Sequence, residues 1–271
     1  MGDNMKRLEQ VGLEHVRAVY AGPECDLWEL IMGSQIHVGG LESSRDLANR
    51  AGIQPGSRGV DLCCCKGTGM LFLCRFCDVA SMTGVDATEK MVEEGRARVQ
   101  RQGFADRIQF VHAEATRTGL PAGEFDFVWG EDAWCYVDDK AALIAEAVRL
   151  VRPGGTIAFT DWVEGGSPLS DDEARRFMTF MKFPSFATVN DYARLLEQNG
   201  CRVDCAVDTG RFTACVNLYI SMLERQLTYD ALAILGFDQA MMEAVLGEMT
   251  FARDLAHEGK LAQARFVAVK R

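Results

Sequence analysis

The sequence predicts an α/β protein built on a doubly wound, mostly parallel sheet. From about residue 59 onward, short apolar runs alternate with longer amphipathic ones, and this rhythm is typical of parallel strands joined by crossover helices. The segment Arg152-Pro153-Gly154-Gly155 is a strong helix-stop and turn signal between two such units. With 271 residues, 48% of them hydrophobic, the chain has enough material for one large domain or a domain with an insertion.

Each predicted strand is a short apolar run, and each predicted helix has an apolar face and a charged face. The strands should cover residues 59–63, 81–85, 108–112, 125–129, 156–161, 202–208 and 263–269. The helices between them should cover residues 68–79, 88–102, 140–151 and 189–199.

Two helical regions depart from this alternation. Residues 1–50 precede the first predicted strand, and residues 216–258 form a helical stretch, interrupted near Gly236, before the last strand. Open α/β sheets bind ligands in the crevice at the carboxyl ends of their strands. We therefore expect an N-terminal helical lid over residues 1–50 and a main domain over residues 51–271. Within the main domain, residues 216–258 should be inserted as a helical cap.

The charge balance is acidic, with 29 basic and 39 acidic residues and a formal net charge of −10. Such a field repels polyanions, so neither nucleic acid nor an anionic membrane is an expected partner. Residues 1–12 lack the apolar stretch of a secretory leader. The ten cysteines, three of them consecutive, are therefore expected to be reduced thiols in a cytoplasmic protein.

A glycine-bearing turn joins the first predicted strand to the first helix of the main domain. It contains Gly67-Thr68-Gly69, and about 17 residues further on the second strand ends at Asp86. Backbone N–H groups of such a turn can approach a ligand closely, and a carboxylate after the second strand can bind ribose hydroxyls. The combination predicts a nucleoside site. A nicotinamide site is the alternative, but the third glycine of its usual pattern is replaced by Phe72.

These residues resemble the class I S-adenosylmethionine-dependent methyltransferases over roughly residues 58–160. The likeness runs through Asp61–Gly67, Asp86, residues 113–115, residues 125–129 and the turn at residues 152–155. It implies a Rossmann-like sheet of seven strands with an antiparallel last strand, and S-adenosylmethionine as the cofactor. The residues implied to bind the cofactor are Asp61, Cys63, Cys65, Gly67, Asp86, Ala87, Glu114, Ala115, Gly130 and Glu131.

A narrower resemblance links the chain to the sarcosine/dimethylglycine and phosphoethanolamine N-methyltransferases. It rests on Gly33-Ser34-Gln35-Ile36-His37-Val38-Gly39, on residues 129–134 and on residues 259–261. It implies that the N-terminal helices form a lid over the cofactor. The sequence departs from the group at Cys63 and Cys65, where glycine is usual, and at Met32, where tryptophan is usual.

The resemblance favours methyl transfer to a small polar acceptor, preferably an amine nitrogen. The candidate catalytic residues are His37, Asp132 and Tyr136, and the candidate substrate-binding residues are Trp134, Trp162 and Cys135. A carboxylate beside aromatic faces can hold a small ammonium group. Equally, the two tryptophans can be packing residues, Asp132 can cap a helix and His37 can be a hydrogen-bonded loop residue.

Two further hypotheses remain open on the sequence alone. The cysteines at glycine positions are compatible with a protein that binds the cofactor without ordinary methyl transfer. The other hypothesis is a methyltransferase for a soft acceptor such as a thiol or trivalent arsenic, which Cys135 or Cys215 would contact. No metal is expected, because the four histidines show no metal-ligand spacing. The chain is expected to be a monomer or a homodimer.

Overall fold

The computed structural model describes residues 5–271, and at its centre is a seven-stranded sheet in the order β4-β3-β2-β5-β6-β9-β8. Neighbouring strands from β4 to β6 are parallel, whereas β9 runs antiparallel to both β6 and β8. The predicted doubly wound sheet with an antiparallel last strand is therefore confirmed. Its strands are β2 (Arg58–Leu62), β3 (Ser81–Asp86), β4 (Ile108–His112), β5 (Phe125–Glu131), β6 (Val151–Glu164), β8 (Cys201–Asp208) and β9 (Leu261–Lys270).

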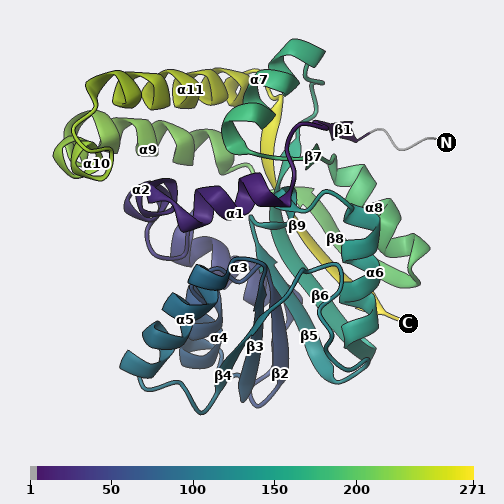
Figure 1. Ribbon diagram of the computed structural model, residues 1–271. Coiled ribbons are helices and arrows are strands. Elements are labelled where there is room, and N and C mark those ends of the chain that lie inside the picture. Colours follow the sequence, from purple (N-terminus) through teal and green to yellow (C-terminus); the bar gives the residue numbers. More distant parts are fainter. Residues whose placement is uncertain (1–4) are drawn as a thin grey trace.

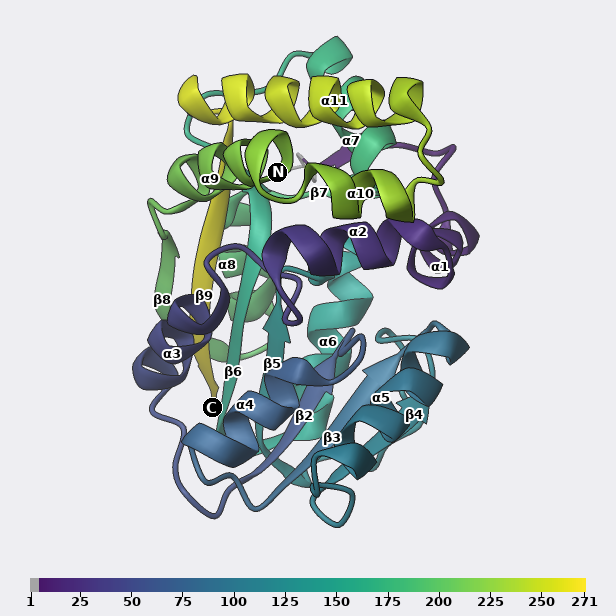
Figure 2. The ribbon, with the colours of Figure 1, turned by 90° about the vertical axis from the view of Figure 1, so that its left-hand side faces the viewer.

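Helices cover both faces of this sheet, as Figures 1 and 2 show. One face carries α3 (Gly40–Ala51), α4 (Thr68–Phe76) and α5 (Glu89–Arg101), and the other carries α6 (Lys140–Leu150) and α8 (Val189–Gln198). The central strands are buried on both sides, with Val60 and Leu62 of β2 fully inaccessible. This explains why their sequences read as nearly continuous apolar runs.

A second, helical layer lies beyond the carboxyl ends of the parallel strands (Figure 2). Its core is a separate hydrophobic cluster that joins helices from both ends of the chain. Among residues 5–271, no helix is both long and apolar enough to cross a bilayer. The layer contains α1 (Leu13–Ala21), α2 (Pro23–Met32), α7 (Asp171–Met181), α9 (Phe212–Arg225), α10 (Thr228–Ile234) and α11 (Gln239–His257).

Three features differ from the sequence-based expectation. The stretch predicted as 216–258 begins at Phe212 and is broken twice, once after Arg225 and once where Gly236 and Phe237 have φ of 66° and 61°. Helix α7 was not predicted, although Ser170 and Glu173 form a capping box at its start. Strand β6 starts at once after α6, because the predicted turn at residues 152–155 loops out between two residues that pair with β5.

The N-terminal region is divided between the two layers. Helices α1 and α2 belong to the helical layer, whereas α3 packs on β6, β9 and α4 beside the sheet. Strand β1 (Lys6–Arg7) pairs with β7 (Ser185–Phe186), which ties the start of the described chain to the segment after α7. Residues 1–4 of the predicted lid lie outside the described residues.

Candidate active site

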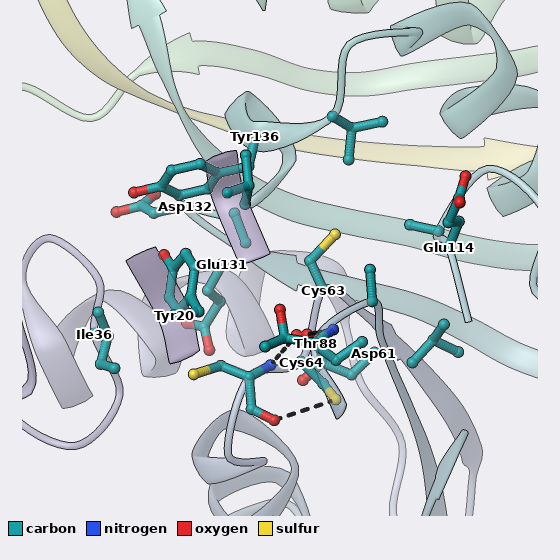
Figure 3. A pocket seen from close by; sticks show the side chains of 18 of the residues that line it. Tyr20, Ile36, Asp61, Cys63, Cys64, Thr88, Glu114, Glu131, Asp132 and Tyr136 are labelled. Atoms are coloured by element: carbon teal, nitrogen blue, oxygen red, sulfur yellow. Dashed lines mark hydrogen bonds between the residues drawn. The ribbon is translucent and has the colours of Figure 1, made fainter. Parts of the chain in front are cut away.

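A cavity of ≈ 280 Å³ lies between the carboxyl ends of the parallel strands and helix α1. Figure 3 shows side chains from β2, β3, β5 and the N-terminal region converging on it. Its position is the ligand-binding crevice expected of an open α/β sheet. The predicted site residues that line it are Asp61, Cys63, Cys65, Asp86, Ala87, Glu114, Ala115, Glu131, Asp132 and Tyr136.

The floor of the cavity is the turn of residues 63–67, here called the cofactor loop. Cys63 and Cys65 have φ of 64° and 47°, in the left-handed region that normally favours glycine. The loop is held by hydrogen bonds from the Cys63 and Cys64 amides to the Val85 carbonyl, at 2.8 and 3.1 Å. The loop therefore has the left-handed backbone conformation that is usual for glycine, although cysteines occupy these positions. Gly67 ends the loop at φ 74°, and a Cβ there would meet the Phe110 ring at 2.6 Å.

Asp86 connects the cofactor loop to the end of β3. Its carboxylate accepts hydrogen bonds from the Cys65 and Thr88 amides, both at 2.8 Å. Burial raises the pKa of Asp86, and these amide donors oppose that rise. The carboxylate is therefore fixed in direction while its remaining lone pairs face the cavity.

Two further carboxylates, those of Asp61 and Glu131, line the sheet side of the cavity. Glu131 accepts hydrogen bonds from the Ser44 hydroxyl at 2.7 Å and the Trp129 indole at 3.1 Å. Burial first, and then the nearby charges of Glu131 and Asp86, hold the pKa of Asp61 well above its ordinary value. A cation entering the cavity beside Asp61 would relieve this penalty.

His37 and Asp132 anchor the loop between α2 and α3. His37 is 1% exposed, and its Nε2 lies 3.1 Å from the Ser44 hydroxyl and 3.3 Å from Glu131. Asp132 accepts hydrogen bonds from the Val38 amide at 2.8 Å and from the Gln263 amide group. Both side chains thus hold the loop to the sheet, and only Asp132 also lines the cavity.

The family model and a similar protein point to the same enzyme class. Residues 60–159 match the family model of a methyltransferase domain. The 27-O-demethylrifamycin SV methyltransferase of Amycolatopsis mediterranei is 28% identical over 202 residues, which cover 69% of this chain and 74% of that protein. This chain is an S-adenosylmethionine-dependent methyltransferase. The nicotinamide alternative is thereby set aside.

Two solved structures show the same fold as this methyltransferase. One is described as a sarcosine dimethylglycine methyltransferase from Galdieria sulphuraria, with a TM-score of 0.78, 17% identity and coverage of 92% of this chain and 98% of that one. The other is phosphoethanolamine N-methyltransferase 2 of Haemonchus contortus with phosphomonomethylethanolamine and S-adenosylhomocysteine. It has a TM-score of 0.79 and 18% identity, and the match covers 95% of this chain and 58% of that one.

The residues of the cavity fit this cofactor. S-adenosylmethionine carries a sulfonium and an ammonium group, and a cation in the cavity would offset the burial and the neighbouring negative charges that raise the pKa of Asp61. Asp86 is in place to accept hydrogen bonds from ribose hydroxyls, and the exposed Glu114 carboxylate lies at the cavity edge. The protein groups therefore supply both the acceptors and the negative charge that the cofactor requires.

Tyr20 is a cavity residue of the methyltransferase that the sequence did not single out. It comes from α1 and packs edge-on against Tyr136 with a ring-centroid distance of 5.3 Å, and the two phenols face the cavity in Figure 3. Burial raises the pKa of both phenols, so each stays protonated at neutral pH. No sequence signal marks Tyr20, because its partner is brought to it only by the docking of α1.

Several candidate residues lie elsewhere. Trp134 is fully buried, donates to the Leu62 carbonyl at 3.2 Å and stacks on Phe159 at 4.0 Å. Trp162 packs against Phe212 in the core of the helical layer, at a ring-centroid distance of 4.8 Å. Neither ring lines the cavity, so the structure places both in packing positions. The other candidates outside the lining are Cys135, Cys215, Gly67, Gly130 and His37.

The described residues hold no group of three histidine, cysteine or acidic side chains in an arrangement that could bind a metal ion. All ten cysteines lie within the described chain and are free thiols.

Proposed function

We propose that this methyltransferase transfers the methyl group to the amine nitrogen of a small acceptor that carries no phosphate. The observation that supports this is the charge of the cavity wall. Its acidic lining residues are Asp61, Asp86, Glu114, Glu131, Asp132, Asp138 and Asp139. Such a wall attracts an ammonium group and repels a phosphate.

The cationic lining residue, Lys66, is already engaged. Its ammonium group lies 2.8 Å from Glu29, 3.1 Å from Glu94 and 3.5 Å from Asp26. A phosphate placed in the cavity would have to compete with three carboxylates for this one lysine, and each charge-assisted contact it displaced would cost about 1.5–3 kcal/mol. Recognition of a phosphorylated acceptor is therefore disfavoured among the described residues.

The chain contributes orientation and the exclusion of water rather than a covalent nucleophile. The cofactor supplies a methyl group on a positively charged sulfur, and displacement requires the acceptor nitrogen to be in line with it. In this proposal Asp86 and Glu114 orient the nucleoside, and Asp61 and Glu131 attract the charged end. Cys63, Cys65, Ala87 and Ala115 shape the surrounding wall, whereas Gly67 and Gly130 do not line it.

The acceptor would lie beside Tyr20, Tyr136 and Asp132. Neutral phenol oxygens can accept a hydrogen bond from an amine, and the two ring faces favour a methylated cation by about 0.5–2 kcal/mol per contact. His37 would act as a positioning residue, because it contacts Glu131 and Ser44 rather than the cavity. The helices α1 and α2 would serve as the lid, with α9 to α11 as the cap.

A soft acceptor is the second candidate. Cys135 and Cys215 do not line the cavity, but Cys63, Cys64 and Cys65 do. The pKa of each of these three thiols lies well above its ordinary value. Burial is the main cause for Cys63 and Cys64, and for Cys65 burial adds to the effect of the Cys25 thiol. As thiols rather than thiolates they are weak ligands for trivalent arsenic, so the amine acceptor is preferred.

The remaining expectations follow from the same features. We propose a cytoplasmic location, since ten free thiols suit a reducing compartment. A small molecule rather than nucleic acid suits a chain with a net charge of −10. The monomer and the homodimer stay as the two proposed states, and sedimentation velocity distinguishes them.

The acceptor class is tested with isotopically labelled S-adenosylmethionine and matched pairs of amines that differ only in a phosphate, such as ethanolamine and phosphoethanolamine. Methylated product should form with unphosphorylated amines, and the phosphorylated partner should react at least about tenfold more slowly. Faster reaction of the phosphorylated partner would refute the exclusion of phosphate, and methylation of hydroxyls or thiols but of no amine would refute the amine assignment. Cofactor binding without product from any amine, hydroxyl or thiol in a metabolite pool would instead favour a binding protein.

The assignment of Asp86 is tested by Asp86→Asn, which keeps the shape and one acceptor oxygen while removing the charge. We expect S-adenosylhomocysteine to bind about 10–100-fold more weakly, since hydrogen bonds to a charged group contribute about 1.5–3 kcal/mol each. Calorimetry measures the affinity, and the exposed Asp106→Asn is the matched control. Unchanged affinity in Asp86→Asn would contradict the ribose role.

A further inference from the structure

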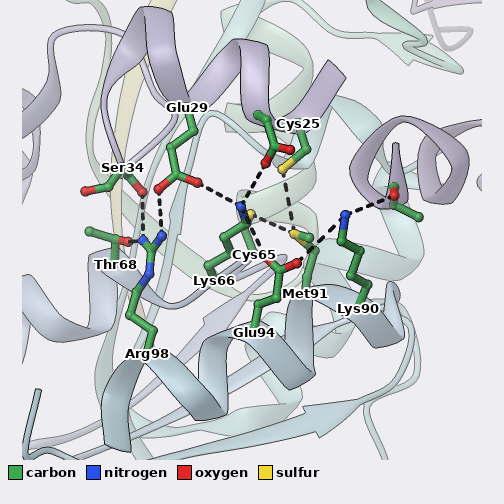
Figure 4. Close-up of polar contacts among 12 residues, drawn as sticks. Cys25, Glu29, Ser34, Cys65, Lys66, Thr68, Lys90, Met91, Glu94 and Arg98 are labelled. Carbon is green, nitrogen blue, oxygen red and sulfur yellow. Dashed lines mark hydrogen bonds and ion pairs between the residues drawn. The ribbon is translucent and has the colours of Figure 1, made fainter. Parts of the chain in front are cut away.

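Three sulfur atoms from separate parts of the chain meet beside the cavity. The Cys65 sulfur lies 3.4 Å from the Met91 sulfur, and the Cys25 sulfur lies 3.8 Å from the same atom. Figure 4 shows them where α2, the cofactor loop and α5 come together. The Cys25 and Cys65 thiols therefore contact one and the same sulfur atom, and each shifts the pKa of the other. Rotation of the two side chains past Met91 is the movement that a covalent bond between them requires.

The pair is chemically unequal. The neighbouring Cys65 thiol lowers the pKa of Cys25 despite the burial of Cys25, and the positive charge of Lys66 acts in the same direction. The Cys25 thiol, together with burial, raises the pKa of Cys65. Cys25 is thus the better nucleophile, and Cys65 keeps its proton. Inequality of this kind is found in dithiols that react with oxidants.

The two cysteines lie on different elements of the fold, so a bond between them would join these elements. Cys25 lies on α2, whereas Cys65 lies on the cofactor loop and lines the cavity. We propose that Cys25 and Cys65 are a redox modification site at which a peroxide forms a reversible disulfide that fastens α2 to the cofactor loop. The functional effect rests on the proposed lid role of α2.

The step balances with hydrogen peroxide as the oxidant. The Cys25 thiolate attacks one peroxide oxygen, so an S–O bond forms, the O–O bond breaks, and the departing hydroxide takes the Cys65 proton to become water. The Cys65 thiolate then attacks the Cys25 sulfenic acid, so the S–S bond forms and a second hydroxide leaves. The two sulfurs lose two electrons in total, and the peroxide gains them.

The disulfide should control cofactor exchange. In the reduced protein α2 is held to the cofactor loop by side-chain contacts alone, whereas a covalent link prevents the helix from moving away. S-adenosylhomocysteine already in the cavity should then leave more slowly.

The full-length protein is treated with hydrogen peroxide and digested with trypsin without reduction. Mass spectrometry should find peptide 18–45, which contains only Cys25, linked to peptide 59–66, with fragmentation placing the link at Cys65. Stopped-flow measurement should show release of S-adenosylhomocysteine slowed about tenfold or more, and a reducing phosphine should restore it. Cys77→Ser should behave as the wild type, since Cys77 lies at the carboxyl end of α4, whereas Cys25 and Cys65 lie on α2 and on the cofactor loop.

Cys25→Ser should bind S-adenosylhomocysteine as the reduced wild type does and lose both the link and the effect of peroxide. Cys65→Ser should also abolish the link. The proposal is overturned if excess peroxide yields no peptide joined through Cys25 and Cys65, or if Cys25→Ser responds to peroxide as the wild type does. Binding by the untreated protein tests the cofactor site separately, so the two failures are distinguishable.

Discussion

At the scale of single residues, the cofactor loop carries side chains where its backbone favours glycine. Left-handed φ values at Cys63 and Cys65 cost about 1–2 kcal/mol each for an ordinary L-residue. The surrounding contacts offset this cost: the Cys63 amide is bonded to β3, and the Cys65 amide is bonded to Asp86. The cysteines therefore alter the chemistry of the cavity wall, while the backbone there keeps the left-handed conformation that favours glycine.

The strain at Cys63 can be measured by substitution. Cys63→Val should lower the free energy of unfolding by about 1–3 kcal/mol, because a β-branched side chain tolerates positive φ poorly. Cys63→Gly should change it by less than about 1 kcal/mol, since relief of strain is offset by the entropy of the unfolded glycine. Urea unfolding followed by fluorescence measures both. Equal stability of the valine and glycine variants would argue against strain at this position.

At the scale of elements, α2 is fastened over the cofactor loop by charge. Glu29 of α2 receives hydrogen bonds from Lys66 at 2.8 Å and from Arg98 of α5 at 2.6 Å, and these three residues are here called the latch (Figure 4). Burial alone would raise the pKa of Glu29, but the two cations lower it. The latch therefore stabilises the docked helix above the ordinary pKa of a glutamate, and this contribution is lost as the pH falls through the lowered value.

Removal of the charge should loosen α2. Glu29→Gln should speed the release of S-adenosylhomocysteine several-fold and lower the free energy of unfolding by about 1 kcal/mol, because the Glu29 pairs are partly exposed and screened. The effect should shrink at high salt. Glu24→Gln, on the same helix and exposed, is the control. The latch is excluded as a restraint if both variants release the ligand at the wild-type rate.

At the scale of the whole molecule, the centre of the protein concentrates buried charge. Asp161 accepts hydrogen bonds from Tyr192 at 2.6 Å and from the Cys135 amide at 3.0 Å. Burial raises the pKa of Asp161 to about 6, and burial lowers the pKa of Lys140 to about 8. The charged forms of Asp161 and Lys140 are therefore less favourable in the folded state than in the unfolded chain. The cavity with its acidic lining residues lies next to these two groups.

The pH dependence of stability follows from Asp161. The free-energy cost of ionising the buried Asp161 carboxyl group is fully present above about pH 6. This cost is lost as the pH falls towards the ordinary pKa of an aspartate, near 4. Wild-type protein should therefore gain stability relative to Asp161→Asn when the pH falls from about 7 to about 5. Urea titrations at the two pH values measure this, with Asp106→Asn as the control. A difference between wild type and Asp161→Asn that is independent of pH would show that the carboxyl group does not titrate in this range.

Much of the fold could be predicted from the hydrophobic pattern of the sequence, whereas less of the candidate site could be predicted in this way. The strand–helix alternation located every strand of the large sheet, because parallel strands are buried on both faces and read as apolar runs. The helical layer was harder: α7 was missed, and the stretch before β9 is three helices instead of a stretch with a single break. Amphipathic helices of a cap have no fixed order in space, so their periodicity does not reveal their partners.

The sequence by itself determined the sheet, the cofactor loop, Asp86 and the methyltransferase class, because these depend on turns and strand ends that are close along the chain. Only the tertiary structure decided which distant side chains share the cavity. It placed Tyr20 there, put Trp134 and Trp162 into packing positions, and brought Cys25 and Cys65, which are 40 positions apart in the sequence, to the same Met91 sulfur. The physical reason is that helix docking is set by the burial of whole faces, and no local pattern encodes which faces will meet.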